Sequence, residues 1–277
     1  MRFFTPLTCT AFFLSILLCS CSNDDSKTEE AVKTEPLCNI TSITDNWYLD
    51  TQFGTPNTSE FAFDAQGRII LAPVGSRQIS FEYYTDRIIL KYSNEAPNTV
   101  TDYYTLNDKK LITHLVRRAM NTYFGDTELK DYMVLDFIYD NEGYLTAIKE
   151  GDKQSTFTYT DGNLTNINDK LKDEDTNYVF SYNTNETFQA LPLAYLTPIY
   201  HMRSLHRIPT PSHNPTGMAI LTSAGYFGKL PKNQIKSIAT YSFTYTKNDK
   251  KQIIKLKTVD SEESIDSTVY KFNYLCK

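Results

Sequence analysis

The sequence of 277 residues contains little of what usually indicates catalysis or nucleic-acid binding. It has no cluster of lysine and arginine and a formal net charge of -5, which argues against a nucleic-acid partner. Glycine is scarce, with 10 residues, and no nucleophile elbow, phosphate-binding loop or dinucleotide fingerprint is present. We therefore expect a protein that is not an enzyme and that holds no cofactor.

Long hydrophobic runs are also lacking, and the longest one lies at the N-terminus. Residues 7–19 are uncharged and mostly apolar, but they are too short for a helix that spans a membrane, which needs ~20 residues. The run follows Arg2 and ends in the sequence LCSC at residues 18–21, which resembles a bacterial lipobox. We predict a lipoprotein signal peptide in residues 1–20 and acylation, including palmitate, at Cys21.

The segment after this cysteine is polar. Residues 22–36, SNDDSKTEEAVKTEP, contain one large aliphatic side chain, Val32, so they cannot bury enough apolar surface to offset the entropy of ordering. We predict a lipidated tether over residues 21–37 and a single β-rich domain over 38–277. The acidic start of the tether resembles the export signal of Bacteroidetes surface lipoproteins. It predicts an outer-membrane lipoprotein on the cell surface, with the periplasmic leaflet as the alternative.

Few cysteines remain for the folded domain. Cys9 and Cys19 belong to the predicted signal peptide, and Cys21 carries the lipid. Cys38 and Cys276 then lie at the two ends of the domain, in an oxidising compartment. We predict a disulfide between these two residues, and a pair of free thiols is the alternative.

A unit of about twenty residues recurs through the domain. The copies are EFAFDAQGRIILA from residue 60, SFEYYTDRIILKY from 80, DYYTLNDKKLITHL from 102, DFIYDNEGYLTAIK from 136, TFTYTDGNLTNI from 156 and SFTYTKNDKKQIIKLK from 242. Most copies place alternating aromatics before a polar turn and an aliphatic strand, which is typical of a β-hairpin. Residues 64–67, 140–143 and 161–163 supply turn residues that tolerate positive φ. The sequence predicts an all-β antiparallel meander that forms a large curved sheet or incomplete barrel.

The alternation of side chains predicts which face of the sheet is buried, because a slip of one residue would expose every aromatic at once. The residues expected to face the core are Phe157, Tyr159, Phe180, Tyr182, Phe243 and Tyr245, and those expected to face water are Thr158, Ser181 and Thr244. Strands of a transmembrane barrel need ~9–11 residues with a continuous apolar band. Most of these strands are shorter and several carry charges, so we expect a tethered domain outside the bilayer.

The hairpin pattern stops between residues 188 and 232. Six prolines in this stretch argue against continuous strands. Residues 216–229 show no alternation and follow Pro215, which predicts a short apolar helix. We expect this segment, near 216–228, to plug or cover the open aromatic face of the sheet.

Together these features resemble a known family. The F-x-Y-(D/T)-x-x-G-x-L hairpins, the late apolar helix and the sequence GKLPKN at 228–233 are similar to those of a family of Bacteroidetes lipoproteins. That family is catalogued as domain of unknown function 4595 and described as having a porin-like fold. The resemblance covers roughly residues 40–275. It implies the fold, but no activity, cofactor or catalytic residue.

Candidate ligand-binding residues are few. They are Trp47, His201, Arg203, His206 and Arg207. The histidine spacing matches no common metal-binding pattern, so we expect no metal and a solvated loop, with a cationic patch for acidic glycans as the alternative. The single tryptophan is a candidate for stacking on a sugar.

These observations predict a non-enzymatic module that the lipid anchor attaches to the membrane. Its expected role is binding of a ligand, either a glycan or an envelope protein, or a structural role in the envelope. The alternative is an extracytoplasmic hydrolase whose site the motifs do not reveal.

Overall fold

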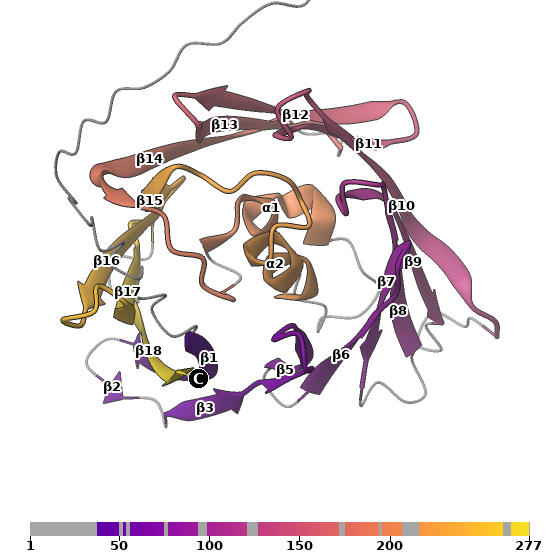
Figure 1. Cartoon of the computed structure of the whole chain (residues 1–277). Coiled ribbons are helices and arrows are strands. Elements are labelled where there is room, and N and C mark those ends of the chain that lie inside the picture. The colour runs from indigo at the N-terminus through magenta and orange to yellow at the C-terminus, as the bar shows by residue number, and fades with distance from the viewer. Residues whose placement is uncertain are drawn as a thin grey trace, which may run out of the picture. The chain divides into compact units, whose positions relative to one another are not determined.

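A computed structural model describes the folded domain. It covers residues 38–49, 52–53, 56–74, 77–93, 99–120, 127–171, 175–193, 196–206, 216–262 and 267–276. Within these ranges, eighteen strands form one sheet that curves around short helices in its interior (Figure 1).

The elements follow the chain in the order of their labels. The strands are β1 (Cys38–Leu49), β2 (Gln52–Phe53), β3 (Asn57–Glu60), β4 (Ala62–Phe63), β5 (Ile69–Val74), β6 (Arg77–Tyr83), β7 (Arg87–Tyr92), β8 (Thr99–Leu106), β9 (Ile112–Met120), β10 (Lys130–Tyr139), β11 (Leu145–Glu150), β12 (Lys153–Thr160), β13 (Asn163–Asp169), β14 (Thr176–Thr187), β15 (Asn233–Ile238), β16 (Tyr241–Lys247), β17 (Ile253–Asp260) and β18 (Ser267–Cys276). The helices are α1 (Pro198–His201), the 3-10 helix η3 (Arg203–His206) and α2 (Thr216–Ser223).

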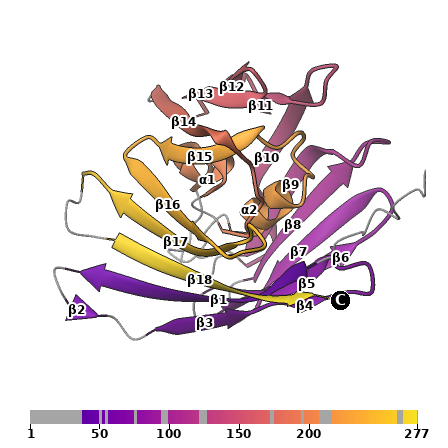
Figure 2. The same ribbon diagram turned by 60° about the vertical axis from the view of Figure 1, so that its left-hand side comes forward.

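The sheet is an antiparallel meander that nearly closes on itself. From β4 to β18, each strand pairs with the next one along the chain. The last strand, β18, pairs with β1, and β1 pairs with β3. Only Phe61 separates β3 from β4, so the sheet returns to its starting strand (Figure 2). The predicted all-β meander and incomplete barrel are confirmed.

At two places the chain changes its pairing partner partway along a stretch of extended backbone. Residues 57–60 pair with β1, whereas 62–63 pair with β5. In β14, residues 176–179 pair with β13, whereas the pairing with β15 starts at Phe180. The ladder is interrupted at both places, which we call the β3–β4 split and the β14 split.

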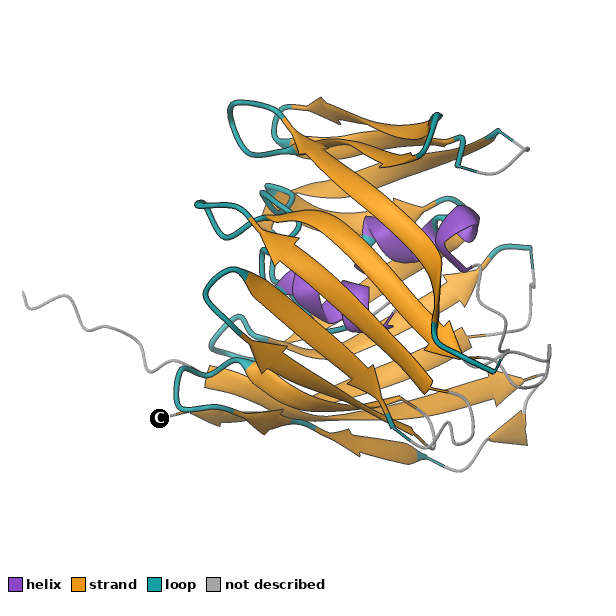
Figure 3. Cartoon of the chain, turned by 90° about the vertical axis from the view of Figure 1, so that its right-hand side faces the viewer, coloured by secondary structure: helices purple, strands orange, loops and turns teal. Residues whose placement is uncertain are grey.

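Hairpin turns gather at one end of the sheet, which we call the turn end (Figure 3). Four of them have the same construction, in which an Asp or Asn oxygen accepts the backbone N–H groups two and four residues later. The accepting residues are Asp64, Asn107, Asp140 and Asn248. The fourth residue of each turn has positive φ: Gly67 (78°), Lys110 (63°), Gly143 (92°) and Lys251 (61°). The twenty-residue repeat is therefore a hairpin with a conformationally fixed turn.

Tyrosine hydroxyls join neighbouring strands near the turn end. Each donates a hydrogen bond of 2.6–2.9 Å to a backbone carbonyl near the start of the preceding strand. The pairs are Tyr83 to Ile69, Tyr139 to Ile112, Tyr182 to Leu164, Tyr245 to Ile235 and Tyr274 to Ile253. Burial raises the pKa of the first four well above the ordinary tyrosine value and that of Tyr274 to about 12. We call these five residues the latch tyrosines.

The predicted inner and outer faces are largely confirmed. Phe157, Phe180 and Phe243 are buried, and the three predicted tyrosines are half-buried against the same core. Thr158 and Thr244 are exposed. Ser181 differs from the prediction, because it is half-buried and its hydroxyl lies 2.6 Å from that of Ser237 across the β14–β15 pair.

The helices fill the space inside the sheet (Figure 1). In α2, the residues from Gly217 to Leu221 are buried, which confirms the predicted apolar helix. Gly217 is required by close packing, since a Cβ there would lie 2.5 Å from a methyl group of Leu90. No helix in the described ranges is long and apolar enough to cross a membrane.

The segment from Tyr226 to Asn233, which we call the rim segment, runs along the hairpins at the turn end. Its backbone joins three successive hairpins: the Tyr226 carbonyl accepts from Ile112, Lys229 donates to Gly143, and Lys232 donates to Gly162. Gly228 packs so closely that a Cβ would meet the Gly143 carbonyl oxygen at 2.6 Å. The GKLPKN sequence thus fastens the interior segment to the sheet.

Cys38 is disulfide-bonded. The residue opposite it in the register of β1 and β18 is Cys276. This register supports the predicted pairing of the two cysteines.

Candidate functional site

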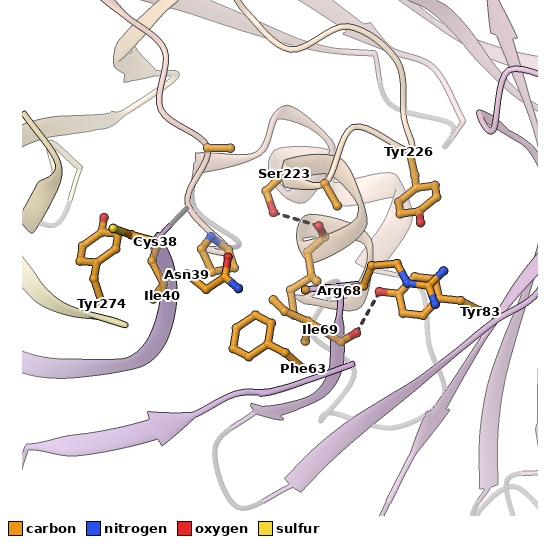
Figure 4. A pocket seen from close by; sticks show the side chains of 15 residues that line it. Cys38, Asn39, Ile40, Phe63, Arg68, Ile69, Tyr83, Ser223, Tyr226 and Tyr274 are labelled. Carbon is orange, nitrogen blue, oxygen red and sulfur yellow. Dashed lines mark hydrogen bonds between the residues drawn. The ribbon is translucent and has the colours of Figure 1, made fainter. Parts of the chain in front are cut away.

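The turn end contains a cavity of about 340 Å³, which we call the rim cavity (Figure 4). Its lining comes from the start of β1, the β4–β5 hairpin, the ends of β6 and β18, and the interior segments around 190–192 and 220–226. Pockets of roughly 300–1,000 Å³ are typical of small-molecule sites. The cavity lies beside the β3–β4 split, where β1 leaves its pairing with the meander.

The rim segment does not cover the rim cavity, because it starts beside the cavity at Tyr226 and runs along other hairpins. This segment covers the hairpins that connect β8 to β13 and starts at Tyr226. The ring of Tyr226 stacks on that of Tyr83, with centroids 6.0 Å apart. Beyond this pair, Phe63, Ile69 and Tyr274 supply much of the apolar lining.

Among the described residues that line the cavity, Arg68 is the only one with a charged side chain. Its guanidinium lies over the Tyr83 ring, 4.4 Å from the centroid, and its Nη2 is 2.6 Å from the Asp64 carboxylate. Burial acts to raise the pKa of Asp64, but hydrogen bonds from the Arg68 backbone and guanidinium outweigh it and hold that pKa below its ordinary value. The pair therefore stays ionised at neutral pH and adds no net charge to the cavity.

Three side chains of the rim cavity have unused binding capacity. Neither the amide of Asn39 nor the hydroxyl of Tyr226 forms a hydrogen bond to any residue that the structure describes. Phe63 is half-buried, yet it does not belong to the packed core and has no aromatic partner within the described ranges. The Asn39 amide thus offers a donor and an acceptor, the Tyr226 hydroxyl can act in either role, and Phe63 offers an aromatic face to a ligand.

A second hollow of about 620 Å³ lies beside the β14 split. Its lining is mostly polar and includes Thr160, Asp161, Asn163 and Lys232. Asn163 is engaged there, because its amide donates to Asn233 and its carbonyl oxygen accepts from the Asn233 backbone. Thr160, Asp161 and Lys232 are exposed, so this wider hollow is an open depression of the surface.

A charged cluster is buried on the inner face of β7, β8 and β9. Asp102 is 0% exposed and Arg117 is 1% exposed, and the two form a bidentate ion pair. Tyr92 and Tyr104 both donate to the same carboxylate oxygen. Burial acts to lower the pKa of Arg117, but the Asp102 charge outweighs it and raises that pKa. Because both carboxylate oxygens are already bonded, the cluster acts as a structural connection between three strands.

Another buried carboxylate, Asp169, holds the interior helices. One of its oxygens accepts from the Ser155 hydroxyl at 2.7 Å, and the other accepts from the Ser204 backbone at 3.2 Å. Ser204 belongs to η3, so this contact fixes the entry of that helix. Groups of three or more potential metal ligands do not occur in the described part of the chain.

Of the predicted ligand residues, the structure places the side chain of His201 alone, and it corrects the prediction for that residue. His201 is buried in α1 and its ring packs on Tyr241 with centroids 5.3 Å apart, so the prediction of a solvated histidine loop is wrong there. The prolines that exclude strands permit a one-turn helix, and that turn carries the histidine inward. The remaining candidates are not placed: the side chains of Trp47, Arg203 and His206, and the whole of Arg207 and Cys21, lie outside the described residues.

The rim cavity was not anticipated from the sequence. Phe63 belongs to a recognised hairpin repeat, and an inward aromatic of this kind is normally core. Asn39 follows Cys38 in a strand with no polar pattern of its own, and Tyr226 follows the interior helix. Only the closure of the sheet brings the three together.

Comparison with known proteins identifies the fold. A family model described as a domain of unknown function (DUF4595) with porin-like fold matches residues 61–256. The chain belongs to this family. The match spans the meander from the β4–β5 hairpin to β17, and it includes the helices and the rim segment. The predicted family resemblance is confirmed.

Two solved structures share the architecture of this family member. A porin-like protein from Bacteroides uniformis ATCC 8492 aligns with a TM-score of 0.53 and 16% identity, over 85% of this chain and 98% of that chain. A porin-like protein from Bacteroides vulgatus ATCC 8482 aligns with a TM-score of 0.52 and 13% identity, over the same shares. At these identities the likeness shows the fold alone. No protein with a curated description matches the chain.

Proposed function

We propose that this protein is a lipid-anchored, extracytoplasmic binding module that holds a small ligand in the rim cavity. The observation that carries the proposal is the cavity itself. The cavity holds about 340 Å³, which falls within the range of small-molecule sites, and its Asn39 amide and Tyr226 hydroxyl form no hydrogen bond to any described residue. Both residues are half-buried at the wall of an open cavity, so their polar groups are accessible to a ligand.

The two faces of the sheet support binding rather than passage through a pore. A membrane barrel carries an apolar band outside and a polar lumen inside. Here the inner face is a packed apolar core around helices, and the outer face carries exposed charges such as Asp136, Lys255 and Lys257. The porin-like description of the relatives thus fits the shape of the sheet. The filled interior favours a module that presents a site at one end.

A cavity-filling variant tests the site. Ala224 lines the rim cavity and is exposed, so Ala224→Trp is expected to fill the space without disturbing the core. Screening of a small-molecule fragment library by ligand-observed NMR should give compounds that bind the wild-type protein and lose binding in Ala224→Trp. Thr244→Trp, on the exposed outer face of β16, is the matched control and should bind like wild type. Equal binding by all three proteins, or none by the wild type, would favour a structural role.

The anchor requires a separate test, motivated by the LCSC sequence at 18–21. Cys21→Ala should abolish incorporation of a labelled fatty acid, because only this cysteine occupies the acceptor position. Replacing Asp24 and Asp25 by Ala should leave labelling intact and reduce digestion by protease added to whole cells. Persistent labelling of Cys21→Ala contradicts the anchor, and unchanged digestion of the aspartate variant contradicts the export signal.

A further inference from the structure

The geometry points to a neutral sugar, of one or two rings, as the ligand of the rim cavity. This inference rests on the proposed function, and it adds the chemical class of the ligand. It follows from three properties of the lining residues: charge, unused hydrogen-bonding groups and an unused aromatic face.

The charge of the rim cavity favours a neutral ligand. Arg68 has the only charged side chain in the described part of the lining, and its Nε and Nη2 already donate to the carboxylate of Asp64, at 2.6 Å in each case. An anionic ligand could use only the remaining N–H groups of this guanidinium, next to the Asp64 carboxylate that already neutralises it, unless it displaced Asp64. That carboxylate also accepts two backbone N–H groups of the β4–β5 turn, so its displacement would disrupt the turn. A cationic ligand meets no unpaired carboxylate in the part of the lining that the structure describes.

The unused polar groups exclude a purely apolar ligand such as an acyl chain. The amide of Asn39 offers a donor and an acceptor, and the hydroxyl of Tyr226 offers either role. A bound hydrocarbon would displace water from both groups without forming hydrogen bonds to them, which is energetically unfavourable for each group. The ligand must therefore carry several hydroxyl or amide groups.

The ligand must also have an apolar face. Phe63 lines the cavity without a stacking partner in the described structure, and Ile69 lies beside it (Figure 4). Ile220 and Tyr274 add further apolar surface to the lining. A sugar ring combines a flat face of C–H groups with a rim of hydroxyls, and so matches an aromatic wall next to amide and phenol groups. The volume of about 340 Å³ is near the lower end of ligand sites, which limits the ligand to one or two rings.

Calorimetric titration of the purified full-length protein tests the inference. The probes are D-glucose, D-galactose, N-acetyl-D-glucosamine and their β-linked disaccharides, with D-glucuronate as an anionic control and toluene as an apolar one. We expect at least one neutral sugar to bind and glucuronate to bind more weakly than glucose. Asn39→Leu and Tyr226→Phe should each weaken sugar binding about tenfold, because each removes hydrogen bonds while nearly preserving volume. Asn177→Leu, at an exposed position of β14, is the matched control and should change nothing.

The outcomes separate the ligand class from the site. If toluene binds, sugars do not, and Asn39→Leu strengthens toluene binding, the sugar inference is overturned while the binding site of the proposed function stands. Tighter binding of glucuronate than of any neutral sugar also overturns it. If no probe binds, or if a sugar binds equally well to Asn39→Leu, Tyr226→Phe and Ala224→Trp, both the inference and the proposed site are wrong.

Discussion

Raising the pH above about 10 is expected to unfold the domain in one cooperative transition. Burial raises the pKa of the latch tyrosines Tyr83, Tyr139, Tyr182 and Tyr245 well above the ordinary value. Above the pKa of an unfolded tyrosine, the unfolded chain releases protons that the folded protein retains, so the free energy of unfolding falls as the pH rises. Each group contributes about 1.4 kcal/mol per pH unit, and four contribute about 5 to 6.

This slope is large compared with the total stability of a typical domain, about 5 to 15 kcal/mol. Unfolding should therefore be complete within about one to three pH units above the tyrosine value. Circular dichroism and the absorbance of tyrosinate, recorded on one titration, should change together. Tyr182→Phe removes one latch hydroxyl and should make the loss of stability with pH less steep, by about 1.4 kcal/mol per pH unit. Ionisation of most tyrosines while the β-sheet signal persists would contradict the burial of the latches.

Arg117→Met is expected to destabilise the domain by about 3 to 5 kcal/mol, because it leaves the Asp102 carboxylate buried without its counter-charge. Asp102 and Arg117 are essentially inaccessible to water, and neither can be rehydrated without opening the sheet. In this variant, Tyr92 and Tyr104 would still donate hydrogen bonds to the Asp102 carboxylate. These two bonds compensate for only part of the lost interaction with Arg117. Urea unfolding followed by circular dichroism measures the effect.

A double variant distinguishes the cost of an unpaired charge from the loss of packing. In Asp102→Asn with Arg117→Met, no charge remains and the amide oxygen still accepts from both tyrosines. Replacing both members of a buried ion pair is often nearly neutral, so the double variant should regain most of the lost stability. If the double variant is as unstable as Arg117→Met alone, packing around the arginine stem accounts for the effect and the charge does not.

Features that depend on local chemistry could be predicted from the sequence. The period of two placed Phe157 and Phe243 in the core, and the Asp-x-x-Gly sequence fixed the turns that end in Gly67 and Gly143. The helix after Pro215 followed from the loss of alternation. In each case the signal lies within a few consecutive residues, where backbone preference and side-chain period agree.

Features that depend on closure of the sheet could not be predicted in this way. The rim cavity joins residues of β1, β4 and the segment after α2, and no local pattern records that these meet. The prediction that His201 is solvated was wrong for a related reason. A histidine among prolines is ordinarily solvated, and here only the enclosing sheet provides an apolar surface, including Tyr241, on which it packs.

The repeated hairpin has a consequence for how relatives of different size can arise. One repeat adds two strands and returns the chain to the turn end, so the remaining strands keep their direction and their inward side chains. The diameter of a closed sheet grows with the number of strands. Gain or loss of a whole hairpin would therefore change the width of the interior while leaving every other turn and latch intact. We therefore expect relatives to differ in length by multiples of about twenty residues. We also expect the size of their interior helices to match the width of the sheet.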